Sequence, residues 1–216
     1  MSGPAAVELL EISVNIIERS FQYCYGCPMA RTRQFDADAA LDAAIGVFRE
    51  HGFEGSSAQM LVAAMGIGRQ SLYATFGDKW QLYCSAVRRY GMGECAAHLD
   101  ALRGGPRAID GIEAMLRRVV ETADQPCLGV GSICEFGASR PDLAEIYDAL
   151  AAGLHTAVAA RIRDAQREGD IAVHIDPDVA VGFLVANISG IRVAGRGGAG
   201  PTALTEMAAM ALRAIR

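Results

Sequence analysis

Apolar residues recur at helical spacing from one end of this chain to the other, whereas the strict alternation of a half-buried strand is nearly absent. This pattern predicts an all-α fold. The longest apolar stripe steps by three or four residues after Pro141, which predicts a core helix at 142–168. Its members are Leu143, Ile146, Tyr147, Leu150, Leu154, Val158 and Ile162.

A corner of two short helices is predicted after the first clear amphipathic helix. That first helix spans 36–51 and ends at Gly52, because glycine readily adopts the left-handed conformation that stops a helix. A short helix follows at about 57–64, capped by Ser56 or Ser57, with its buried side predicted to contain Met60, Leu61 and Ala64.

The stretch "MGIG" at 65–68 predicts a tight turn, and a second short helix follows at 69–75 before Gly77. Asp78 is placed to cap a long helix that continues to about residue 102. Two short helices joined by a glycine-containing turn, after a longer amphipathic helix, have the plan of a helix-turn-helix motif.

The remainder of the chain reads as further helices separated by glycine and proline breaks. Their expected spans are 107–123, 127–139, 142–168, 176–195 and 201–215. The one plausible domain boundary lies inside the helix that begins after Asp78. The sequence therefore predicts a small N-terminal domain and a larger helical domain after it.

Composition limits the function classes. The net charge of −5 argues weakly against nucleic-acid binding without excluding it, since local geometry can outweigh the sum. Six cysteines and four histidines show no zinc-like spacing, so we expect no metal and no cofactor. No nucleophile with a neighbouring base and no paired carboxylates are found, so we expect no enzyme.

No membrane span is predicted, because no apolar run approaches the required ~18–20 uninterrupted residues. The apolar N-terminus carries Glu8 and Glu11 where a secretory signal has positive charge. These features favour a cytoplasmic protein that does not bind a membrane.

Residues 35–87, "FDADAALDAAIGVFREHGFEGSSAQMLVAAMGIGRQSLYATFGDKWQLYCSAV", resemble the DNA-binding domain of TetR-family transcriptional regulators. The matching features are "A..VF.EHGFEGSS", "AAMGIG", "SLYATF" and "GDKWQL", in the family's order and spacing. The resemblance implies a three-helix helix-turn-helix domain, here 31–80, followed by a larger helical ligand-binding and dimerisation domain, 81–216. Because "MARTRQFD" from Met29 resembles a usual family start, residues 1–30 are interpreted as an extension, which is either upstream of the natural start or a real additional segment.

The resemblance makes the segment 68–76 the recognition helix. Arg69 and Gln70 lie at its N-terminal end, where a guanidinium can read guanine and an amide can read adenine. Tyr73 and Lys79 are expected to reach backbone phosphates. The full set of expected DNA contacts is Arg31, Arg33, Ser57, Arg69, Gln70, Ser71, Tyr73, Thr75 and Lys79.

The resemblance also implies a ligand pocket and a homodimer. The pocket candidates combine polar or polarizable groups within aliphatic helices: Met92, Met115, Phe136, Tyr147 and His155. The two closing helices contain many small residues that permit close helix approach, so we assign the dimer interface to them.

These expectations converge on a ligand-responsive regulator. It is predicted to be a repressor that binds a palindromic double-stranded DNA operator as a homodimer and is released by a small-molecule effector. One alternative is a regulator that senses through a cysteine thiol. A second is a helical small-molecule-binding protein without operator activity.

Overall fold

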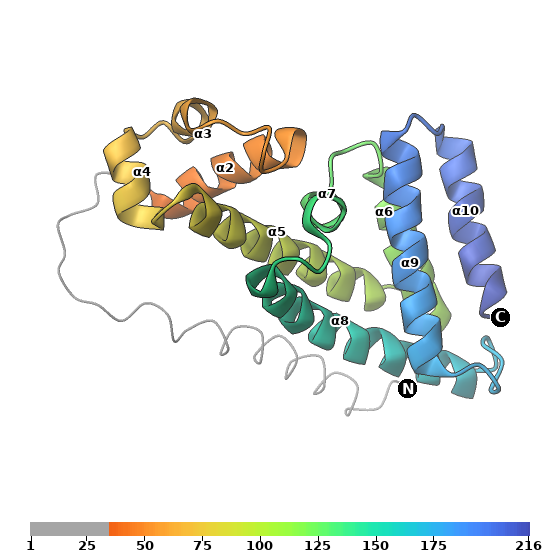
Figure 1. Ribbon diagram of the computed structural model, residues 1–216. Coiled ribbons are helices and arrows are strands. Elements are labelled where there is room, and N and C mark those ends of the chain that lie inside the picture. The colour runs from red at the N-terminus through yellow and green to blue at the C-terminus, as the bar shows by residue number, and fades with distance from the viewer. Residues whose placement is uncertain (1–34) are drawn as a thin grey trace. The chain divides into compact units, whose positions relative to one another are not determined.

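The computed structural model describes residues 35–216, which fold entirely into helices and connecting loops (Figure 1). Within this range there are nine helices and no strand, as the all-α prediction requires. They are α2 (Ala37–His51), α3 (Ala58–Met65), α4 (Arg69–Phe76), α5 (Lys79–Leu102), α6 (Ala108–Glu121), α7 (Leu128–Phe136), α8 (Pro141–Arg167), α9 (Pro177–Arg196) and α10 (Pro201–Ala214).

The chain divides into two compact units. Among the described residues, the first unit contains 35–93 and 126–148, and the second contains 94–125 and 149–216. The first unit therefore includes α7 and the beginning of α8 in addition to the helices of the predicted helix-turn-helix.

Side-chain caps fix the helix starts in the first unit. The Asp36 carboxylate accepts hydrogen bonds from two amides at the start of α2, and Ser57 Oγ accepts one from the Met60 amide at the start of α3. Asp78 and Gln81 exchange hydrogen bonds at the start of α5, which makes a capping box. These contacts confirm the predicted helix starts at 36, 57 and 78.

Two differences from the predicted helices have simple causes. In α3 the buried residues are Leu61 and Met65, whereas Ala64 is exposed, because the face against α2 lies one residue further along than predicted. Helix α7 ends at Phe136 rather than at residue 139, since Gly137 adopts a φ of 54°.

An aromatic cluster joins three segments of the first unit. Phe53 in the α2–α3 turn, Trp80 and Tyr83 of α5, and Phe136 of α7 have ring centroids 5.1–5.8 Å apart. Most of these pairs pack edge to face, the arrangement that the aromatic quadrupole favours. Because Tyr83 is fully buried, the cluster forms part of the core of this unit.

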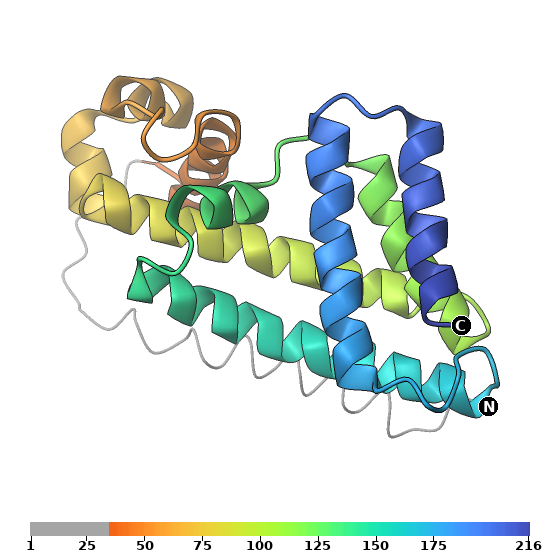
Figure 2. The same ribbon diagram turned by 45° about the vertical axis from the view of Figure 1, so that its right-hand side comes forward.

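The second unit packs α6, α9 and α10 against one another around an apolar core (Figures 1 and 2). Gly195 of α9 approaches the end of α6 so closely that a Cβ there would lie 2.6 Å from the Ala123 carbonyl oxygen. The core includes Leu99, Ile112, Leu116, Val119, Leu184 and Ile191, each less than 3% exposed.

A polar cluster lies within the second unit. The Glu94 carboxylate of α5 accepts hydrogen bonds from Arg118 of α6, at 2.8 Å, and from Arg192 of α9. Arg192 is only 5% exposed and His98, one turn after Glu94, is 6% exposed. Burial, reinforced by the positive charge of Arg118, lowers the pKa of His98 to about 4.

Helix α9 is long and apolar enough to span a membrane by length and composition alone, although the sequence analysis predicted no span. A single such helix is weak evidence for a membrane span, because the core helix of a soluble protein passes the same test.

The lowered pKa of His98 is expected to make the protein less stable in acid. The pKa of His98 is about 4 in the folded protein and 6.5 at its ordinary value. Between these two pH values the unfolded chain binds more protons than the folded chain does. The free energy of unfolding therefore falls as the pH drops through this range. We expect a loss of about 3 kcal/mol between about pH 6.5 and about pH 4 in urea unfolding. His98→Leu should remove this contribution, while His174→Leu, at an exposed loop position, should retain it. An unchanged pH slope in His98→Leu would contradict the assignment.

Candidate nucleic-acid interface

The turn between α3 and α4 is shaped by two glycines. Gly66 ends α3 in the left-handed conformation, with φ 64° and ψ 25°. The next residue, Ile67, is buried, and Gly68 then starts α4 without a side-chain cap. The first-turn amides of α4 therefore lie at a helix N-terminus that suits a phosphate or another hydrogen-bond acceptor.

Helix α4 has one buried face and one exposed face. Leu72 is 1% exposed and anchors the helix, with Phe76 half-buried beside it. Arg69, Gln70 and Tyr73, three of the expected DNA contacts, are exposed and lie together on the outer face. Ser71 and Thr75 are half-buried at the borders of that face.

Arg69 and Tyr73 lie one helical turn apart. The Arg69 guanidinium carbon is 6.0 Å from the centroid of the Tyr73 ring, which is at the limit of a cation–π contact. This proximity groups a charge and an aromatic hydroxyl at one end of α4.

Lys79 begins α5, and its amino group lies 4.2 Å from the centroid of the Phe53 ring. From the sequence, Lys79 was expected only to contact a phosphate. The ring attraction is a second, structural reason for a cation at this helix start, because the negative face of an aromatic ring offsets the unfavourable helix dipole.

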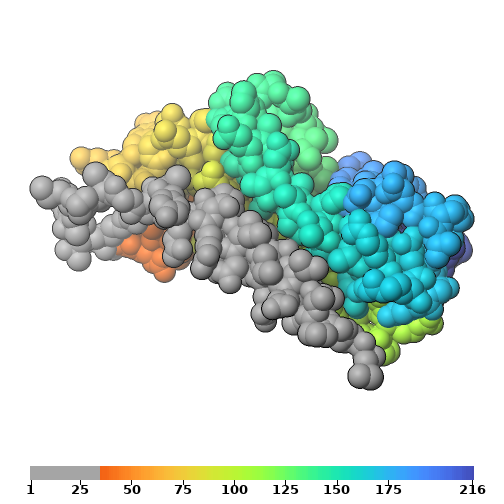
Figure 3. All heavy atoms as spheres, turned by 90° about the horizontal axis from the view of Figure 1, so that it is seen from below, coloured from red at the N-terminus to blue at the C-terminus, as the bar shows by residue number. Residues whose placement is uncertain are grey.

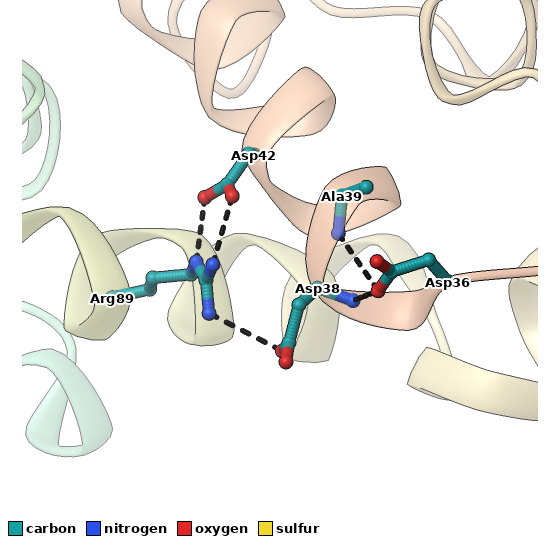
Figure 4. A network of polar contacts seen from close by, with 5 residues as sticks. All are labelled: Asp36, Asp38, Ala39, Asp42 and Arg89. Atoms are coloured by element: carbon teal, nitrogen blue, oxygen red, sulfur yellow. Dashed lines mark hydrogen bonds and ion pairs between the residues drawn. The ribbon is translucent and has the colours of Figure 1, made fainter.

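An arginine of α5 neutralises acidic side chains of α2 (Figure 4). Arg89 makes two hydrogen bonds to the Asp42 carboxylate, at 2.5 and 2.8 Å, and one to Asp38 at 3.2 Å. The hydrogen bond from Arg89 lowers the pKa of Asp42, so this carboxylate stays ionised and paired. The role of Arg89 was not predicted from the sequence, because nothing in the local pattern joins residues 47 positions apart.

Helix α7 supports the turn between α2 and α3. The Glu135 carboxylate accepts hydrogen bonds from the backbone amides of Phe53 and Glu54, at 2.9 and 2.8 Å. Phe136 follows in the aromatic cluster, and the Arg49 side chain donates a hydrogen bond to the Pro126 carbonyl just before α7. Sequence reasoning gave Glu135 no role, since it reads as an ordinary exposed glutamate.

Trp80 has polar partners as well as aromatic ones. The Arg140 guanidinium carbon lies 3.5 Å from the centroid of the Trp80 ring, and the indole N–H donates a hydrogen bond to the Asp142 carboxylate. These contacts attach the start of α8 to the start of α5 within the first unit.

The five predicted pocket residues fall into different environments. Met92, Phe136 and Tyr147 belong to the first unit and are half-buried. Met115 is fully buried in the core of the second unit. His155 is exposed on α8, the helix seen as the teal band in Figure 3, and its Nε2 is 3.7 Å from Oδ1 of Asp178.

Arg31 and Arg33 lie outside the described residues, as does the predicted N-terminal extension. Among residues 35–216, no group of histidine, cysteine and acidic side chains could hold a metal ion.

Taken together, a three-helix corner with an exposed polar face on its last short helix defines a helix-turn-helix DNA-binding protein. Residues 40–85 match the family model described as bacterial regulatory proteins, tetR family.

The chain is similar to the uncharacterized HTH-type transcriptional regulator YezE of Bacillus subtilis, with 32% identity over 148 residues, 66% of this chain and 76% of that protein. It is 28% identical over 196 residues to the HTH-type transcriptional repressor ComR of Escherichia coli, covering 88% of this chain and 93% of that one. A cysteine mutant of the TetR-family regulator CifR, complexed with 26-bp double-stranded operator DNA, has a TM-score of 0.70 and 30% identity, covering 88% of this chain and 100% of that chain. The chain belongs to the TetR family of transcriptional regulators.

The contact between α7 and the α2–α3 turn predicts a measurable stability effect. Glu135→Ala removes the acceptor of two backbone hydrogen bonds, and because the site is exposed, water replaces part of the loss. We expect a decrease of roughly 1 kcal/mol in the free energy of unfolding, measured in urea.

Glu145→Ala, at an exposed glutamate of α8, is the matched control and should change stability far less. Equal effects of the two substitutions would show that the Glu135 contacts do not hold the turn.

Proposed function

We propose that this protein is a transcriptional repressor that binds a palindromic operator as a homodimer and is released by a small-molecule effector. The observation that carries the proposal is the exposed group Arg69, Gln70 and Tyr73 on a short helix anchored by the buried Leu72. In support, the similar CifR mutant is complexed with operator DNA, and the similar ComR is a repressor.

In the proposed complex α4 lies in the major groove. Arg69 and Gln70 contact base edges, with Ser71 and Thr75 as smaller polar partners. Tyr73, Ser57 and Lys79 contact phosphates, and Arg31 and Arg33 form a short basic arm. Because each subunit supplies few cations, affinity depends on two subunits binding together and falls only modestly with salt.

The proposed dimer interface lies on α9 and α10. The exposed α9 residues Val179, Phe183, Ala186, Gly190 and Val193 follow one another at alternating steps of four and three. This is the spacing of a helix–helix seam, and a second copy of the same surface would cover it. On α10, Met210 is also an exposed apolar residue, with 61% of its surface accessible.

We propose that residues 31–80 bind DNA and that residues 81–216 bind the ligand and form the dimer. Residues 1–30 are an extension before these domains. Met92, Phe136 and Tyr147 of the first unit, and Met115 and His155 of the second, remain separate candidates for ligand contacts. The proposed location is the cytoplasm, where the operator is.

Thiol sensing receives less support. Burial raises the pKa of both Cys84 and Cys95 to about 11, so these thiols stay protonated and are poor nucleophiles. Cys134 is exposed and Cys127 is half-buried. Within the described residues neither forms a disulfide.

Substitutions on α4 test DNA reading. Arg69→Ala and Gln70→Ala should each weaken operator binding by ~1–3 kcal/mol, because each removes a base contact. The measurement is a gel shift with DNA flanking the protein's own gene. Arg103→Ala, at an exposed arginine paired with Asp100, is the control and should bind normally. Wild-type-like binding by both α4 variants would sink the proposed reading helix.

A charge placed on the α9 seam tests the dimer. Phe183 is 40% exposed in the single chain, and Phe183→Glu would place a carboxylate against its copy across the seam. We expect this variant to be monomeric in analytical ultracentrifugation and to lose operator affinity. Val173→Glu, on an exposed loop before α9, should stay dimeric. A dimeric Phe183→Glu protein would place the interface elsewhere.

A further inference from the structure

The polar cluster of the second unit has more positive than negative charge. The Arg118 and Arg192 guanidiniums both contact Glu94, and within residues 35–216 it is the only acidic side chain that either one contacts. Hydrogen bonding from Arg118 and the charge of Arg192 lower the pKa of Glu94 despite its burial, so it is ionised. One carboxylate then faces two guanidiniums, which leaves one positive charge in excess.

That excess charge lies where it is costly. The Arg192 side chain is only 6% exposed, and those of Arg118 and Glu94 are about one quarter exposed. A buried charge without a full set of partners destabilises a fold. An incomplete buried ion pair is less stable than apolar residues packed in its place. A balanced structural pair would not need the second arginine.

His98 supplies a second, independent sign of an incomplete site. It lies one turn after Glu94 on α5 and interacts electrostatically with Glu94, Arg118 and Arg192. Its Nδ1 is buried and has no hydrogen-bond partner, although buried polar atoms are rarely left unpaired. A neutral imidazole can carry its proton on this nitrogen and donate it.

The cluster lies beside the apolar core of the second unit. Leu99, Val119 and Ile191 are the sequence neighbours of His98, Arg118 and Arg192, and all three are buried in that core. An anion bound by the guanidiniums would be shielded from water there, which strengthens its attraction to them.

We propose that this cluster binds the carboxylate of the effector, which is a small organic acid. The carboxylate accepts hydrogen bonds from Arg192 and Arg118 and from His98 Nδ1–H, and it competes with Glu94 for the guanidiniums. This inference rests on the proposed function as a ligand-responsive regulator. It adds the chemical class of the effector and the residues that recognise it.

The test compares acids with their amides on the purified full-length protein. Sodium acetate, octanoate and benzoate are titrated at constant ionic strength beside acetamide, octanamide and benzamide, with thermal unfolding and calorimetry as readouts. We expect at least one acid to raise the unfolding midpoint by several degrees while its amide does not. If no acid stabilises the protein more than its amide does, the proposal is wrong.

Two substitutions assign the binding to the cluster. Arg192→Met, which preserves apolar packing, should weaken the binding of that acid at least about tenfold. Glu94→Gln should strengthen it, because the competing carboxylate is gone, whereas a purely structural role for Glu94 predicts only lower stability. Arg117→Met, at an exposed arginine of α6, is the matched control and should bind as the wild type does. Equal binding by the wild type and Arg192→Met overturns the assignment.

Gel shifts on the same preparations separate this inference from the proposed function. Specific operator binding without any response to acids rejects the carboxylate site alone. A folded dimer that binds no operator DNA rejects the proposed function.

Discussion

The aromatic cluster of Phe53, Trp80, Tyr83 and Phe136 is the contact on which the first unit depends. It ties the α2–α3 turn to the first turns of α5 and to the end of α7. Helix α4 has eight residues, too few to be stable alone, so its position is inherited from its neighbours. Leu72 holds it from one side, and α5 begins two residues after Gly77. The position of the exposed residues on α4 therefore depends on contacts made by Leu72 and by the neighbouring helices.

Charge in this protein is arranged locally rather than in bulk. The net charge of −5 argues weakly against a nucleic-acid partner, yet Arg89 pairs with Asp38 and Asp42 and so reduces the negative potential around α2. The second unit has the opposite imbalance, with two guanidiniums for one carboxylate inside its core. Neither feature can be read from the total, because each depends on which side chains meet.

The sequence predicted the helices well because their signals are local. Apolar spacing, the caps Asp36, Ser57 and Asp78, and the glycines at 52, 66 and 77 each act within one or two turns. The association of α7 with the helix-turn-helix was not predicted, since Glu135 contacts amides 81 and 82 residues away. From the sequence, Lys79 was expected only to contact a phosphate and Phe136 only to line a pocket, because local patterns do not show long-range contacts. Their ring contacts with Phe53 form only once the turn is folded.

Amide hydrogen exchange, measured on the full-length protein with and without an operator fragment from the DNA flanking its own gene, tests the central claim most directly. New protection is expected in α3, the glycine turn and α4, from Ser57 to Lys79, with α4 the most affected. Protection confined to the second unit, in a complex that demonstrably forms, would contradict α4 as the reading helix.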